Sequence, residues 1–186
     1  MSLVEMNLDE LARLIQRSLK RSKAVEIDGL GVFARNQAGE ISFRARSPRV
    51  FIAYAVEDAA PAEELFRALS ARGFAAWLDR RKLLPGQNWP RRIEEAIASS
   101  DFFIACFSRQ SVRKRGGFQA EVRYALDCAE RVPLDDVFII PVRLDDCRVP
   151  ARIQKETQYV DLFPDWDAGL QRVFRIIETQ MGSGLQ

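Results

Sequence analysis

From Arg49 onward, short apolar runs alternate with stretches in which apolar residues recur every three or four positions. Parallel strands buried on both faces are apolar nearly throughout, and each crossover between them needs a helix. The pattern therefore predicts an α/β domain of flavodoxin-like architecture, in which helices flank a central parallel sheet of about five strands. The predicted strands are 49–54, 74–78, 101–108 and 137–144, with a short fifth near Tyr159 and Val160.

Two residues predict the limits of the helix after the first strand. Asp58 has the residue type of an N-cap, and Gly73 is suited to end the helix. A later helix is expected from about Phe118 to Arg131, because its apolar residues repeat at helical spacing.

Residues 1–48 follow a different pattern, which predicts a separate small α+β module. Asn7 and Glu10 have the spacing of a capping box, and leucines then recur at helical spacing. Strand-like runs follow, with the turn signal Asp28-Gly29 between the first two. We therefore expect a helix followed by a hairpin. The strand-like runs are 24–27, 30–35 and 40–44.

Composition excludes several classes of function. The 28 basic and 26 acidic residues nearly cancel, so the chain has no overall attraction to nucleic acid or anionic lipid. No apolar run approaches the roughly 18 to 20 residues of a membrane span, which makes a cytoplasmic location the expectation. The chain has no histidine, which excludes Ser-His-Asp and Cys-His nucleophiles and the common zinc-hydrolase sites. Cys106, Cys128 and Cys147 lack paired spacings, so we expect buried thiols and no metal site.

Four ordered signals carry a family resemblance. They are Val50-Phe51-Ile52-Ala53-Tyr54, then Trp77-Leu78-Asp79, then Leu84-Pro85-Gly86, and finally Glu121 within the run 114–122. In this order and at these spacings, the stretch 49–181 resembles the TIR domain family, which leaves 182–186 as a tail. In many bacterial TIR domains, a glutamate at this point cleaves NAD at the nicotinamide ribosyl bond. The resemblance therefore implies that Glu121 is a catalytic residue.

The position of Glu121 on its predicted helix is compatible with that role. It lies about 80° from the centre of the apolar stripe, at 100° per residue, where a carboxylate can face a cleft. Its expected place in the first turn, with Arg115 and Arg123 nearby, favours the ionised form. The alternative from the residues alone is an ordinary surface glutamate that pairs with an arginine.

The implied reaction needs little protein machinery. Nicotinamide leaves as a neutral molecule, so no general acid has to protonate it. One carboxylate can orient the ribose hydroxyls and stabilise the oxocarbenium-like charge. NAD would be the substrate, and no cofactor or metal is expected.

Other positions follow from the resemblance, each with a structural alternative. Tyr54, Ala55 and Val56 correspond to the family's first NAD-contacting loop. Lys82 and Leu84 lie on a loop that contacts ligand and mediates assembly. Ser108 could donate a hydrogen bond to ligand or simply end its strand, and Trp89 could be core or a pocket wall. Active relatives often have tryptophan where this chain has Gly117, so the aromatic wall would come from Phe118, Trp89 or a second subunit, or would be missing.

Two functions remain open at this stage. The first is an assembly-activated NAD glycohydrolase that yields linear or cyclic ADP-ribose, as in bacterial anti-phage defence. The second is a non-catalytic scaffold that self-associates through the loop around Arg80 to Gln87.

Residues 1–48 resemble the histone-like (HU-type) bacterial DNA-binding proteins over about 30 residues. The long DNA-gripping arm of that family is replaced by the short turn from Asn36 to Gly39. DNA binding is therefore not expected, because the arm carries the minor-groove contacts, and nucleic-acid sensing by these residues is the weaker alternative. We expect this module to serve docking or dimerisation, with an activator or docking partner still to be identified.

Overall fold

The computed structural model describes residues 8–27, 31–36, 39–78 and 88–183. The predicted cap Asn7, the turn Asp28-Gly29 and the loop 80–87, which contains Lys82 and Leu84, lie outside these residues. The chain forms two compact units, Met1–Ser47 and Pro48–Gln186, and each is described by itself.

The first unit is a helix packed on a three-stranded antiparallel sheet. Helix α1 (Leu8–Leu19) precedes β1 (Ala24–Ile27), β2 (Gly31–Arg35) and β3 (Ile41–Ala45), and the strand order is β1-β2-β3. The third apolar run therefore extends the expected hairpin to three strands. Asn36 stabilises the turn before β3, because its Oδ1 accepts from the Glu40 amide at 2.9 Å.

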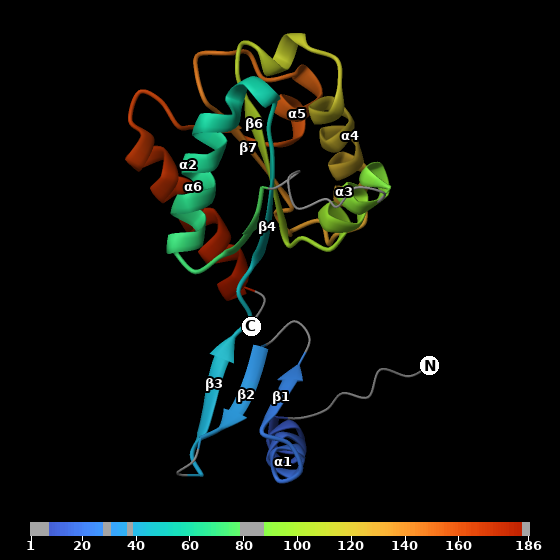
Figure 1. The fold of residues 1–186 in the computed structure, drawn as a ribbon, viewed down its shortest axis with the longest axis vertical. Coiled ribbons are helices and arrows are strands. Elements are labelled where there is room, and N and C mark those ends of the chain that lie inside the picture. The colour runs from blue at the N-terminus through green and yellow to red at the C-terminus, as the bar shows by residue number, and fades with distance from the viewer. Residues whose placement is uncertain (1–7, 28–30, 37–38, 79–87, 184–186) are drawn as a thin grey trace. The chain divides into compact units, whose positions relative to one another are not determined.

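The second unit is an open parallel sheet with helices on both faces (Figure 1). The strand order is β5-β4-β6-β7-β8, and every neighbouring pair is parallel. This confirms the predicted α/β fold. The strands are β4 (Arg49–Ala53), β5 (Ala75–Trp77), β6 (Phe102–Phe107), β7 (Ile139–Arg143) and β8 (Val160–Asp161). The helices are α2 (Ala59–Ala71), α3 (Trp89–Ala98), α4 (Gly117–Ala129), α5 (Ala151–Glu156) and α6 (Trp166–Ser183).

Alternation along the strands divides the core between the two faces. On β6, Phe102, Ile104 and Cys106 pack with the apolar residues of α2 and α6. The residues between them, Phe103, Ala105 and Phe107, pack with those of α3, α4 and α5. Every residue of β6 is buried, which explains why this strand is apolar without interruption.

Gly73 ends α2 as the sequence predicts. Its φ of +89° lies in the left-handed region that glycine adopts without steric cost. The Gly73 amide donates to the Ser70 carbonyl at 3.0 Å, and the Phe74 amide donates to the Leu69 carbonyl at 3.1 Å. These two bonds form a Schellman motif, which turns the chain into β5.

Among the described residues, no helix is long and apolar enough to cross a membrane. The cysteines are unpaired: Cys106 and Cys147 are buried as expected, whereas Cys128 is half-buried. Burial raises the pKa of the Cys147 thiol to about 11.

Candidate functional site

Two hollows lie next to each other on the second unit, and they have Gly117 in common. The strand-tip hollow is formed by residues 54–57 after β4 together with the segment that leads into α4, and it encloses about 210 Å³. The helix hollow lies between α3 and α4 and also encloses about 210 Å³. The candidate residues from the sequence are therefore distributed over two adjoining spaces.

Glu121 lies in the helix hollow. Its side chain is buried, with an exposed fraction of 7%. It is the fifth residue of α4, which begins at Gly117, so it lies one position beyond the expected first turn. The hollow is lined mainly by apolar and aromatic groups, and Glu94 from α3 is its other carboxylate. The structure thus places Glu121 inside a hollow and away from bulk solvent.

The start of α4 depends on Gly116. This residue has a φ of +145°, which L side chains rarely adopt, and its carbonyl accepts the Ala120 amide at 3.2 Å. The helix therefore begins at Gly117 and presents Glu121 toward α3 one turn later.

Two aromatic residues accompany Glu121 in the helix hollow. Trp89 is the first residue of α3, is 47% exposed and forms part of the wall, which fits the second of its two predicted roles. Tyr124 was not predicted, although its position three residues after Glu121 places it on the same side of α4. Partial burial raises the pKa of the Tyr124 phenol, and the neighbouring Cys128 and Glu94 act in the same direction.

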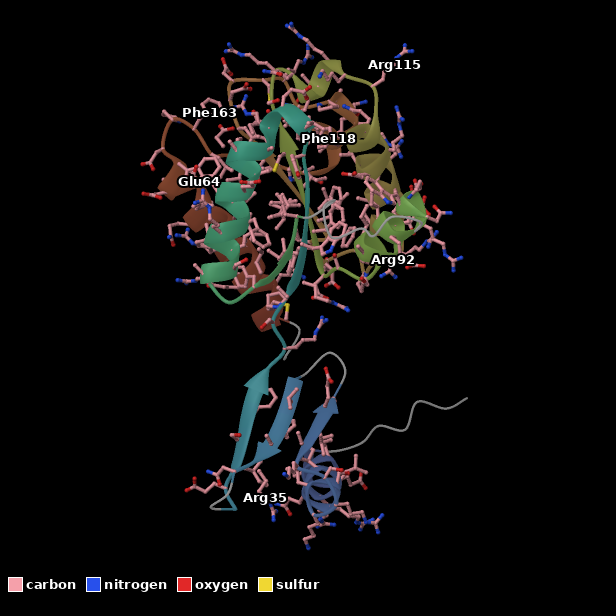
Figure 2. The ribbon with its side chains drawn as sticks, viewed as in Figure 1. Arg35, Glu64, Arg92, Arg115, Phe118 and Phe163 are labelled. Carbon is pink, nitrogen blue, oxygen red and sulfur yellow. The ribbon has the colours of Figure 1, made fainter. Side chains whose placement is uncertain are left out.

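The strand-tip hollow contains the other predicted contacts. Tyr54 is half-buried, Ala55 is buried and Val56 is 70% exposed. Phe118 is buried, with its ring edge-on to Phe107 at 5.5 Å, so it lines this hollow and not the one with Glu121. Figure 2 shows Phe118 inside the domain and Arg115 extending outward near the start of α4.

An ion pair joins the two sides of the strand-tip hollow. Lys114, before α4, donates to the Glu57 carboxylate in the loop after β4. This hydrogen bond lowers the pKa of Glu57. Sequence analysis missed the pair because its members are 57 positions apart.

Ser108 is occupied by an internal network and lines neither hollow. Its exposed fraction is 3%, and its hydroxyl donates to Asp58 Oδ2 at 2.7 Å. The Ser108 hydroxyl oxygen also accepts a hydrogen bond from the Ser111 amide at 3.1 Å. Asp58 occupies the expected N-cap position of α2, but its side chain forms no capping hydrogen bond and accepts one from Ser108 instead. The pair ties the end of β6 to the start of α2.

Burial raises the pKa of Asp58 above its usual 3.8, although the Ser108 hydrogen bond opposes the change. Because its pKa is higher in the folded state, Asp58 contributes to the free energy of unfolding at pH values below 3.8. This contribution is lost as the pH rises through the pKa that Asp58 has in the folded chain. We therefore expect Asp58→Asn to become progressively more stable relative to the native chain as pH rises from about 3 to about 8. Urea unfolding of both chains across this range measures the difference. A difference that shrinks with rising pH would contradict the expectation.

The open parallel sheet, with helices on both faces and a buried glutamate in a hollow between α3 and α4, defines a flavodoxin-like α/β domain with a candidate ligand site. A family model of the TIR domain matches residues 50–174, which is more than half of the chain. The protein therefore belongs to the TIR domain family.

Solved structures of TIR domains resemble this fold. The TIR domain of the Toll-related receptor TRR-2 from Hydra magnipapillata has 24% identity and a TM-score of 0.57, and the match covers 69% of this chain and 97% of that one. The TIR domains of the activated Roq1 resistosome have 19% identity and a TM-score of 0.56, with 70% and 99% coverage. The TIR-STING receptor of C. gigas has 24% identity and a TM-score of 0.54, with 69% and 40% coverage. At these identities the likeness concerns the fold.

A bacterial relative is also similar in sequence. The uncharacterised protein y4cD of Sinorhizobium fredii is 26% identical over 112 residues, which cover 60% of this chain. The match spans only 17% of the length of that protein.

Proposed function

We propose that this TIR domain hydrolyses the nicotinamide ribosyl bond of NAD, with Glu121 as the catalytic carboxylate. The observation that carries the proposal is the location of Glu121. Glu121 is 7% exposed and lines a hollow whose wall includes Trp89. A buried acid at a concave, mostly apolar site is expected where charge develops during a reaction.

The reaction follows from these groups. The bond between the ribosyl carbon and the nicotinamide nitrogen breaks, and nicotinamide leaves with the bonding electron pair. Water then adds to the ribosyl carbon and releases a proton, which gives ADP-ribose. The Glu121 carboxylate stabilises the positive charge on the sugar as the bond stretches. The Trp89 ring, which lines the hollow, would pack against the nicotinamide ring.

The size of the hollows determines how NAD would lie. Each encloses about 210 Å³, which is below the roughly 300 Å³ at the lower end of small-molecule sites. We infer that the dinucleotide spans both hollows across Gly117. Its diphosphate would then lie near Lys114 and Arg115, at the positive end of α4.

Assembly is part of the proposal. The TIR domains of Roq1 that share this fold belong to an activated resistosome. For this chain we propose that self-association, through the loop around Arg80 to Gln87, completes the site. The biological setting that we propose is cytoplasmic anti-phage defence in a bacterium.

A non-catalytic scaffold is the second candidate, and Gly117 is the observation that favours it. A glycine here leaves the helix hollow without the tryptophan that active relatives often carry, and neither hollow alone is large enough for a nucleotide. In that case the domain would act through self-association alone.

Incubation of the concentrated full chain with NAD, with chromatographic measurement of free nicotinamide, separates the two candidates. We expect nicotinamide release that rises more steeply than in proportion to protein concentration, because assembled chains carry the activity. No release at any concentration, including in a crowding agent that drives assembly, would support the scaffold and reject the hydrolase.

A further inference from the structure

The strand-tip hollow brings together charges of opposite sign. Among the described residues that line it, Lys114 and Arg115 are the cations and Glu57 is the acid. Lys114 donates a hydrogen bond to the Glu57 carboxylate, and this bond joins the segment before α4 to the loop after β4. A lysine that the diphosphate of NAD would meet in this hollow is therefore already bound to a carboxylate of the same chain.

Solvent reaches both members of this ion pair. The side chain of Lys114 is 56% exposed and that of Glu57 is 34% exposed. Water and dissolved ions screen such pairs, so they contribute little net stability to a fold. An anionic ligand can therefore replace the Glu57 carboxylate at Lys114 without disturbing the core of the domain.

Only side chains have to move for this replacement. Glu57 lies in the short helical turn Val56–Asp58, where the Asp58 amide donates to the Ala55 carbonyl at 2.8 Å. Ala55 and Asp58 are both buried, so the backbone on either side of Glu57 is held in place. Exposed side chains change rotamer within nanoseconds. Release of Lys114 thus requires a rotamer change and no movement of the loop.

The direction of the effect of Glu57 on an anionic ligand follows from its charge. An ammonium group has three N–H donors, so Lys114 could bind the carboxylate and a phosphate at the same time. Such sharing would bring the carboxylate close to the phosphate, and two negative charges at short range repel each other. Glu57 therefore opposes phosphate binding whether it keeps Lys114 or shares it.

We propose that Glu57 is an internal competitor that limits how tightly the strand-tip hollow binds the diphosphate of NAD. When a phosphate binds Lys114, the Glu57 carboxylate gives up its hydrogen bond and turns toward solvent. This inference rests on the proposed function, because NAD supplies the diphosphate. ADP-ribose carries the same diphosphate, so the competition also speeds release of this product.

Calorimetric titration of the concentrated full chain with ADP-ribose tests the role of Glu57. Glu57→Gln should bind ADP-ribose about three- to fivefold more tightly than the native chain, because glutamine neither holds Lys114 by charge nor repels a phosphate. Glu64→Gln is the matched control. Glu64 is an exposed glutamate on α2 that lines neither hollow (Figure 2). It removes the same charge, and its affinity should change by less than about 1.5-fold.

A double variant shows whether Lys114 is the group for which Glu57 competes. Glu57→Gln combined with Lys114→Gln should bind ADP-ribose more weakly than Glu57→Gln alone, because the ammonium that would bind the phosphate is gone. An equal affinity of these two variants would overturn the proposal. If Glu57 instead held Lys114 in its binding position, Glu57→Gln would bind more weakly than the native chain, and this result would also overturn the proposal. So would the absence of ADP-ribose binding by both the native chain and Glu57→Gln.

The titration and the NAD assay fail in different ways. Tighter binding of ADP-ribose by Glu57→Gln, without release of nicotinamide from NAD by any chain, would keep the competition at Lys114 and reject the hydrolase. Release of nicotinamide together with equal ADP-ribose affinities of the native chain and Glu57→Gln would keep the hydrolase and reject the role of Glu57.

Discussion

Replacing Glu121 by glutamine is expected to lower the rate of NAD cleavage by about a thousandfold. Glutamine has nearly the same shape as glutamate but carries no negative charge, so it cannot stabilise the positive ribosyl group. The fold should persist, because the neutral side chain fits the same buried space beside Trp89. Nicotinamide release under single-turnover conditions, at saturating NAD, measures the effect on the chemical step.

Glu94→Gln is the matched control for this experiment. Glu94 lines the same hollow from α3, but it is exposed to solvent, so its charge is screened. We expect less than about a threefold change in the rate for this variant, in line with the small effects of exposed charges. If Glu121→Gln cleaved NAD at the native rate, the chain would still be an NAD hydrolase, but Glu121 would not be its catalytic residue. Equal losses in both variants would assign the effect to the net charge of the hollow.

Replacing Phe103 by alanine is expected to lower the free energy of unfolding of the TIR unit by about 3–5 kcal/mol. Phe103 is fully buried on β6, the central strand. Its ring stacks on Phe51 with centroids 5.5 Å apart and lies 6.5 Å from that of Phe138. Alanine would leave a cavity in the layer on which α3 and α4 pack.

Urea unfolding followed by tryptophan fluorescence measures this loss. All three tryptophans, Trp77, Trp89 and Trp166, lie in the second unit, so the signal reports on this unit alone. Leu134→Ala serves as the control, because a fully exposed leucine should change the free energy by less than about 0.5 kcal/mol. A loss below about 1 kcal/mol for Phe103→Ala would show that the aromatic layer does not support this side of the sheet.

The strands of the TIR unit, though not their order in the sheet, were predictable because burial on both faces leaves a clear sequence pattern. Residues 101–108 are apolar almost throughout, and β6 occupies Phe102–Phe107. The Gly73 helix end was predictable for a different reason, since only a glycine adopts that backbone conformation cheaply. Helix α5 was missed, because its six residues are too few to show a period.

The arrangement of the site was less predictable, because it depends on contacts between distant residues. Ser108 at a strand end is compatible with ligand binding until Asp58, 50 positions away, is found to accept its hydrogen bond. Likewise, the sequence could place Glu121 and Phe118 on one helix but could not show that they line different hollows. The roles of Lys82 and Leu84 stay predictions.

The connection between the two units has a consequence for how readily TIR domains could meet. Strand β3 ends at Ala45 and β4 begins at Arg49, so only three residues separate the strands. A fully extended tether of this length reaches no more than about 14 Å. If the first units pair, each TIR domain is confined to a small volume around its neighbour, at an effective concentration in the millimolar range. An encounter that is rare in dilute solution then becomes intramolecular, and even a weak contact between TIR domains would be largely occupied.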